Sequence, residues 1–164
     1  MRTVIGVMGL GEDGDPAVLE TTRNLGAAIA REGWVLLNGG RDAGVMAASA
    51  QGAASEGGLV IGVLPDADAG RATPFLDVAI RTGMGEARNA INVLSSDVVI
   101  ALSGGAGTVS EVALALKAGR PVVTLGLETG ELFAAYSAAG QLTSASSVDE
   151  AIALARRALG RERD

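Results

Sequence analysis

The segment between Asp97 and Glu111 (DVVIALSGGAGTVSE) holds the residues of this chain that are best suited to binding chemistry. Residues 98–102 are apolar and rich in β-branched side chains, which is typical of a strand that is covered on both faces. Gly104, Gly105 and Gly107 then remove the side chains where a helix is expected to begin. Because unpaired N–H groups at a helix N-terminus attract anions, the segment predicts a phosphate-binding turn.

Arg88 is a second candidate, shortly after Gly83 and Gly85 and near the expected start of a helix over residues 86–95. A positive charge there opposes the helix dipole, which indicates another use, such as donating two N–H groups to a phosphate. A solvated arginine paired with a surface carboxylate explains the position equally well. Asn89 is adjacent, and Asn92 shares a helix face with Arg88 at a spacing of four residues.

Glu111 allows two interpretations. In the structural one, Thr108 caps the helix and Glu111 folds back onto the cap, since Thr108-Val-Ser-Glu111 has the spacing of a capping box. In the functional one, Glu111 faces the ligand crevice one turn inside the helix, where it orients a water molecule or stabilises positive charge on a ribose. The spacing supports both interpretations equally.

Two more glycine turns follow expected strands, at Gly9-Leu-Gly11 and at Asn38-Gly39-Gly40. None of the turns has the Gly-Lys-Ser/Thr ending of a P-loop, and Gly9-Leu-Gly11 lacks the third glycine of a dinucleotide fingerprint. Arg41 and Asp42 follow the second turn, and their simpler interpretation is as solvent-facing loop residues.

Composition excludes several kinds of chemistry. The chain has no cysteine and no histidine, which rules out disulfides, thiolate or imidazole metal ligands, and histidine bases, and no metal site is expected. The only lysine, Lys117, lies near the end of its expected helix, which argues against a pyridoxal-phosphate enzyme. The net charge of −6 without a basic run makes nucleic acid and membrane surfaces poor partners. Without a signal-peptide pattern, cytoplasmic localisation is expected.

Strand and helix patterns alternate along the chain and predict one Rossmann-like α/β domain over residues 1–164. We expect a doubly wound, mainly parallel sheet of about six or seven strands with helices on both faces. Right-handed crossovers place all the glycine turns at the carboxyl edge of the sheet, where open α/β sheets bind ligands. The small-residue helix expected over residues 43–55 has two possible partners, a second copy of the chain or the chain's own sheet.

Several motifs together resemble the Lonely Guy (LOG) superfamily, part of which carries the misleading label "lysine decarboxylase". Ser103-Gly-Gly-Ala-Gly-Thr-Val-Ser-Glu111 is similar to its Pro-Gly-Gly-x-Gly-Thr-x-x-Glu signature, and Arg88 matches its helical arginine. Gly39-Gly40 with Gly44-Val45-Met46, and the block from Gly57 to Pro65, resemble two further motifs. The segments 82–89 and 114–121 look most like the branch of molybdenum-cofactor carrier proteins.

The resemblance implies binding of a phosphorylated small molecule, either a nucleotide or a molybdopterin-type cofactor, in a carrier or binding role, with no cofactor required for catalysis. The alternative is a LOG-type phosphoribohydrolase that cleaves the N-ribosidic bond of nucleoside 5′-monophosphates. In that case Glu111 and Arg88 would be catalytic. The family also implies a homodimer or homotetramer. The expected ligand-binding residues are Gly39, Gly40, Arg88, Asn89, Gly104, Gly105, Ala106, Gly107, Thr108 and Glu111.

Ser103 stands where the superfamily signature has proline, and Asn89 stands where the hydrolase branch has lysine. Both differences leave the expected phosphate-binding turn intact. They count against hydrolysis and favour the binding role.

Overall fold

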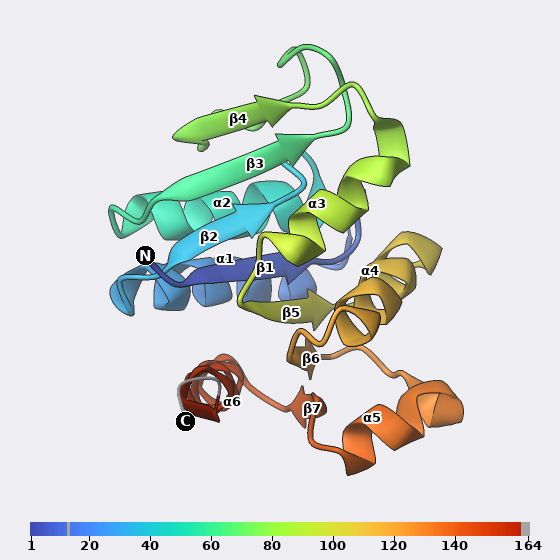
Figure 1. Ribbon diagram of the computed structural model, residues 1–164. Coiled ribbons are helices and arrows are strands. Elements are labelled where there is room, and N and C mark those ends of the chain that lie inside the picture. The colour runs from blue at the N-terminus through green and yellow to red at the C-terminus, as the bar shows by residue number, and fades with distance from the viewer. Residues whose placement is uncertain (13, 162–164) are drawn as a thin grey trace.

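A computed structural model describes residues 1–12 and 14–161 (Figure 1). Its centre is a single sheet of seven parallel strands in the order β4-β3-β2-β1-β5-β6-β7. The strands are β1 (Val4–Met8), β2 (Val35–Asn38), β3 (Val60–Leu64), β4 (Val78–Arg81), β5 (Val98–Leu102), β6 (Val122–Leu125) and β7 (Leu142–Ala145).

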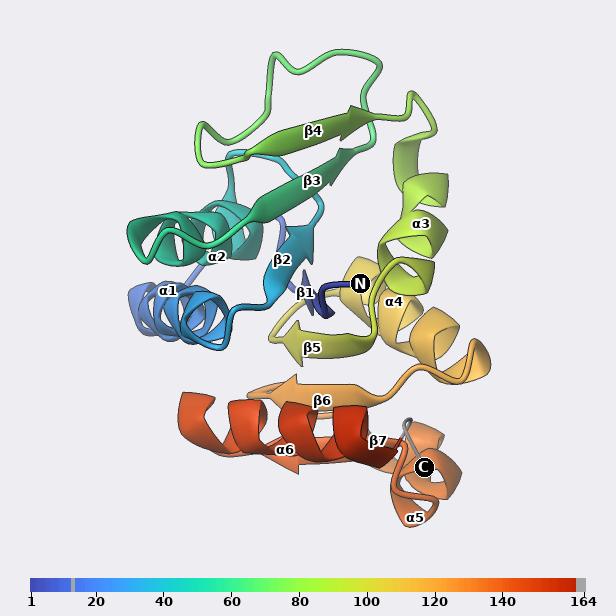
Figure 2. The same ribbon diagram turned by 60° about the vertical axis from the view of Figure 1, so that its left-hand side comes forward.

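A loop connects β3 to β4, helices connect the other consecutive strands, and these helices cover both faces of the sheet (Figure 2). The α-helices are α1 (Pro16–Arg31), α2 (Gly44–Ser55), α3 (Asn89–Leu94), α4 (Ala106–Lys117), α5 (Ala134–Ala138) and α6 (Val148–Arg161). Two short 3₁₀ helices, η1 (Gly85–Arg88) and η2 (Gly130–Phe133), precede α3 and α5. None of the helices in the described part of the chain is both long and apolar enough to cross a membrane.

The strand order reverses beside β1, because the chain builds outward from β1 to β4 on one side and then continues from β5 to β7 on the other. Every strand is parallel to its neighbour, so all strand-to-helix turns lie along one edge. Open sheets of this kind form their ligand crevice at that reversal point. The turns after β1 and β5 therefore lie next to each other, and Leu10 N donates to Ser103 O across them at 3.1 Å.

The core has one apolar cluster on each face of the sheet. On the first face, Leu25 and Ile29 of α1 pack with Val45 of α2 and Ile152 of α6 against the strands. On the second face, Val93 of α3 and residues Val112, Ala115 and Leu116 of α4 cover β1, β5 and β6. The doubly wound parallel architecture expected from the alternating pattern is confirmed.

The small-residue helix α2 packs against its own chain. A Cβ atom added at Gly26 of α1 or at Gly52 of α2 would collide with the facing helix backbone, at Ser49 O and Arg23 O respectively. Glycine at these two positions therefore allows α1 and α2 to approach closely. Helix α2 also contacts β1, β2 and β3, so the chain's own sheet and α1 both cover it.

Candidate functional site

A cavity of about 290 Å³ opens at the carboxyl edge, where β1 and β5 meet. Four elements surround it: the turn after β1, the turn after β2, the η1–α3 segment and the first turns of α4. The lining residues are Val7, Met8, Gly9, Leu10, Gly11, Glu12, Gly39, Arg41, Met46, Glu86, Arg88, Asn89, Gly105, Gly107, Thr108 and Glu111.

Helix α4 begins at the cavity with Gly105 as its N-cap, and no side chain of the described residues caps it. The helix therefore starts before Thr108, and Thr108 lies inside the first turn, almost fully buried. The capping box proposed for Thr108 and Glu111 is wrong, because the glycines after β5 allow the helix to begin earlier. The exposed residues 105–107 leave the first amides of α4 open to the cavity.

Gly104 joins β5 to this helix start in a confined space. A Cβ atom at Gly104 would collide with Thr108 Oγ1 and would lie 3.2 Å from Leu10 N. Gly104 and Ala106 are not among the residues that line the cavity. Their contribution is to place Gly105, Gly107 and Thr108, which do line it.

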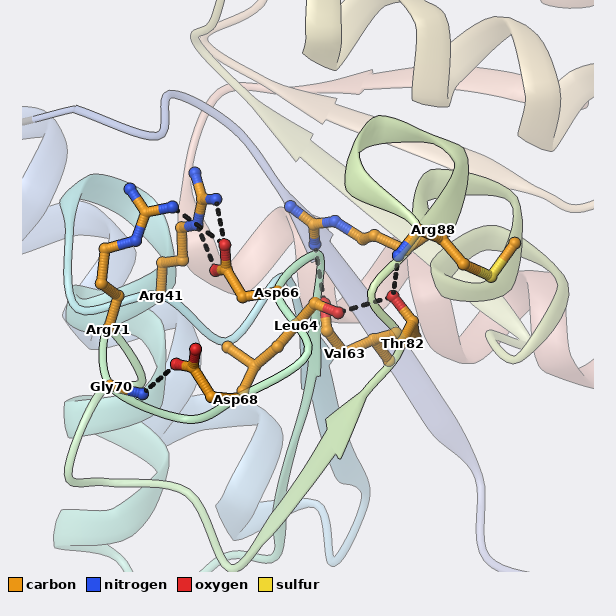
Figure 3. A network of polar contacts seen from close by, with 10 residues as sticks. Arg41, Val63, Leu64, Asp66, Asp68, Gly70, Arg71, Thr82 and Arg88 are labelled. Atoms are coloured by element: carbon orange, nitrogen blue, oxygen red, sulfur yellow. Dashed lines mark hydrogen bonds and ion pairs between the residues drawn. The ribbon is translucent and has the colours of Figure 1, made fainter.

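Arg88 ends η1 with its side chain almost fully buried beneath the cavity, at 8% exposure. Its Nη1 donates to Val63 O of β3 at 3.1 Å (Figure 3). Its Nε is buried without a hydrogen-bond partner in the described part of the chain. Since an unpaired buried donor is costly, Arg88 is a residue prepared for a further acceptor.

Gly39 makes the position of Arg88 possible. A Cβ atom at Gly39 would collide with Arg88 Nη1 and would lie 2.7 Å from Nη2. The guanidinium therefore lies directly against the backbone of the turn after β2. The expected residue Gly39 does line the cavity, and its role in this arrangement is to admit Arg88.

Glu111 faces the same cavity and is 7% exposed. Asn92 Nδ2 of α3 donates to Glu111 Oε1 at 3.1 Å, so the side chain is oriented from the neighbouring helix. Burial raises the pKa of Glu111, although the Asn92 hydrogen bond and the nearby Arg88 charge both oppose the shift. Burial likewise lowers the pKa of Arg88, although Glu111 opposes that change.

The turn after β2 is built differently from the turn after β5. Asn38 Oδ1 accepts from Gly40 N at 2.8 Å, and Leu10 O accepts from Val45 N of α2 at 3.0 Å. The amide of Gly40 and the amide of Val45, in the first turn of α2, are thus already paired. Gly40 is not among the cavity-lining residues, whereas its neighbour Gly39 is.

Nine cavity-lining residues are not among the expected ligand-binding residues, and the charged ones among these nine are Glu12, Arg41 and Glu86. The sequence favours a solvent-facing Arg41, yet this residue is half-buried and points to Asp66, a residue 25 positions away (Figure 3). The contact of Asn92 with Glu111 had a sequence signal, since Asn92 shares a face with Arg88 at a spacing of four residues. Arg41 had none.

Lys117 is the last residue of α4 and is exposed, at the opposite end of that helix from the cavity. A Schiff-base role at the cavity does not fit this position. Among the described residues there is no group of three or more histidine, cysteine, aspartate or glutamate side chains that could hold a metal ion.

The comparison with protein families gives one clear result: the SLOG cluster4 family matches residues 2–152. The chain belongs to the SLOG cluster4 family. The resemblance to the LOG superfamily is thereby confirmed. A cytokinin riboside 5′-monophosphate phosphoribohydrolase of Mycobacterium tuberculosis is 38% identical over 97 residues, which span 58% of this chain and 52% of that protein.

Two solved structures are similar to this chain over almost its whole length. The molybdenum cofactor binding protein of Rippkaea orientalis is 49% identical with a TM-score of 0.92, over 97% of this chain and 98% of that one. The molybdenum cofactor carrier protein of Chlamydomonas reinhardtii is 44% identical with a TM-score of 0.89, over 98% and 99%. The resemblance to the branch of molybdenum-cofactor carrier proteins is confirmed.

Proposed function

We propose that this SLOG cluster4 protein binds a phosphorylated small molecule in the cavity at the carboxyl ends of β1 and β5. The uncapped start of α4 would donate its backbone N–H groups to the phosphate, and Thr108 would add its hydroxyl group. Arg88 would supply a charge-assisted contact from beneath. The observation that carries the proposal is that an open helix N-terminus and a buried, incompletely paired arginine face the same cavity.

The ligand that the carrier relatives suggest is the molybdenum cofactor, bound as cargo. The cavity residues fit its pterin and phosphate parts. Glu111 and Asn89 are nearly buried and face the cavity with polar groups, and Asn89 Oδ1 has no partner among the described residues. Such groups can pair with the ring N–H and carbonyl groups of a pterin, while Arg88 and α4 hold the phosphate.

The binding role is tested by isothermal calorimetry on the full chain with molybdopterin and with AMP as probes. Arg88→Ala is expected to weaken binding about 10-fold or more, because a hydrogen bond to a charged group contributes about 1.5–3 kcal/mol. The matched control is Arg157→Ala, which removes an exposed arginine from α6, away from the cavity. Equal binding by the two variants, or no binding of any probe by the parent protein, contradicts the proposal.

The second candidate function is hydrolysis of a nucleoside 5′-monophosphate. The observation in its favour is that Arg88 and Glu111 line one cavity and interact electrostatically. Glu111 would then stabilise an oxocarbenium-like ribose or orient water, by analogy with glycoside hydrolysis. Incubation with AMP tests this role. Release of adenine that Glu111→Gln abolishes supports hydrolysis, and absence of release leaves the binding role alone.

We also propose that the protein works in the cytoplasm as a homodimer or homotetramer. Leu94 of α3 and Leu114 of α4 are exposed at 58% and 38%, and these two side chains would supply apolar surface for a contact with a second copy. Light scattering on the purified chain gives the oligomeric state directly.

A further inference from the structure

The loop between β3 and β4 is fixed to the turn after β2. Thr73 N donates to Gly40 O at 2.9 Å, and Asp42 N donates to Arg71 O at 2.9 Å. These backbone bonds hold two segments together that are separated by about 30 residues in the chain. They also bring Asp66, at the start of the loop, next to Arg41 at the wall of the cavity.

Asp66 is shared by two arginines. Arg41 donates to it through Nε and Nη2, at 3.2 and 3.1 Å, and Arg71 donates through Nη2 at 2.9 Å (Figure 3). The two guanidinium groups thus share a single carboxylate as their hydrogen-bond partner. Only Arg41 of the two lines the cavity, and its Nη1 takes no part in the bonds to Asp66.

The Arg41–Asp66 pair lies close to Arg88. Arg41 and Asp66 are both near enough to affect the pKa of Arg88, with the like charge of Arg41 lowering it and Asp66 raising it. Figure 3 shows the Arg88 guanidinium reaching toward this group from η1. Two arginines on different elements thus face one cavity, although the exposed carboxylates Glu12 and Glu86 also stand at its lining.

We propose that Arg41 is a second anion-binding residue of this cavity, oriented by Asp66, and that the ligand carries two separate negative groups. The first is the phosphate at α4 and Arg88, and the second binds at Arg41. This inference rests on the proposed phosphate site and extends it. It names the ligand class as phosphate esters with a second anionic group, which a nucleoside monophosphate does not have.

Calorimetry with matched nucleotide probes tests the inference. AMP carries one phosphate, and ADP, adenosine 2′,5′-bisphosphate and adenosine 3′,5′-bisphosphate add a second negative group at three different positions. At least one of these three is expected to bind about 10-fold more tightly than AMP. Arg41→Gln is expected to weaken binding of that probe about 10-fold more than it weakens binding of AMP, which removes the advantage, as it should if Arg41 contacts the second group.

Arg71→Gln is the matched control, because Arg71 shares Asp66 with Arg41 but does not line the cavity. It is expected to keep the preference for the probe with two anions. The inference is overturned if none of the three binds more tightly than AMP, if Arg41→Gln weakens AMP equally, or if Arg71→Gln has the same effect as Arg41→Gln. Failure of both AMP and molybdopterin to bind to the parent protein instead contradicts the phosphate site on which the inference rests.

Discussion

At the scale of single residues, Gly39 gives a direct test of how Arg88 is positioned. Gly39→Ala adds a methyl group that would collide with the guanidinium and with Met46 Sδ, so Arg88 must move. We expect the affinity for AMP or molybdopterin to fall about as far as in Arg88→Ala, roughly 10-fold. Calorimetry on both variants provides the comparison.

The control for Gly39→Ala is Gly11→Ala. Gly11 also lines the cavity, but its added Cβ would meet only Met46 Cε, at an ordinary contact distance of 3.5 Å. This variant is expected to keep the parent affinity. If the two alanine variants behave alike, the position of Arg88 does not depend on Gly39.

Glu111 should affect the pH dependence of the free energy of unfolding as well as ligand binding. Burial raises its pKa above the ordinary 4.5, so the folded state holds the proton to higher pH than the unfolded state. The parent protein therefore loses stability as pH rises from the unfolded pKa to the raised, folded pKa, by about 1.4 kcal/mol for each pH unit that separates the two values. Glu111→Gln removes the titration and can still accept the Asn92 hydrogen bond.

The measurable quantity is the free energy of unfolding of Glu111→Gln minus that of the parent. This difference is expected to be smallest in acid and to increase as pH rises above the ordinary glutamate value of 4.5. Urea unfolding at several pH values determines it. A difference that decreases with pH would mean that Glu111 is stabilised as a carboxylate in the fold.

At the scale of secondary structure, the missing side-chain cap of α4 lowers the stability of the helix and leaves its first amides free to bind an anion. Gly105 is the N-cap, and a Cβ atom there would meet nothing within 4 Å. Gly105→Asp should cap the helix, and it should be about 1 kcal/mol more stable than Gly105→Ala. The same carboxylate would occupy and repel the anion site, so only Gly105→Asp should lose affinity for the phosphate probes.

Thermal unfolding measures the stability of these two variants, and calorimetry measures their affinity for the phosphate probes. Gain of stability with unchanged affinity in Gly105→Asp would show that the ligand does not use the start of α4. Loss of affinity in both variants would instead indicate that any side chain at position 105 blocks the cavity.

Local signals determined how well each element could be predicted. The bounds of α1 follow from the sequence, because Asp15 caps it, Pro16 suits its first turn and Gly33 adopts a positive φ after its end. Local signals are weak in the segment before β7, since η2 and α5 are short and Phe133 is their one buried residue. The start of α4 was open to two interpretations, because Thr108 supplied a plausible but unused cap.

The residues of the site also differ in how well the sequence predicts them. Arg88, Asn89, Thr108 and Glu111 could be identified because each lies within a recognisable motif, and the structure brings all four to one cavity. Arg41 could not, because its position depends on Asp66 and on backbone bonds from the β3–β4 loop. Such contacts between distant segments leave no periodic pattern in the sequence.

At the scale of the whole molecule, the charge distribution predicts how the fold responds to acid. Salt bridges or hydrogen bonds lower the pKa of Glu32, Glu56, Asp66 and Glu150, chiefly through Arg156, Arg31, Arg41 and Ser146 respectively. A lowered pKa means that the stabilisation is present above the ordinary carboxyl value and is lost as pH falls through the folded value. Glu111 has the opposite sign, since acid removes the cost of its buried charge.

In the Glu111→Gln variant, the effect of the surface carboxylates on stability can be measured without the opposite effect of Glu111. Because the chain has no histidine, the side chain that ordinarily titrates near neutral pH is missing, and the melting temperature of this variant should change little between pH 6 and 8. Below about pH 5 it should fall, as the paired carboxylates become protonated. High salt should reduce that fall, because the ion pairs Arg31–Glu56 and Arg156–Glu32 lie at the surface and are screened. A transition between pH 6 and 8, or stability that increases on acidification in this variant, would contradict this account of the charges.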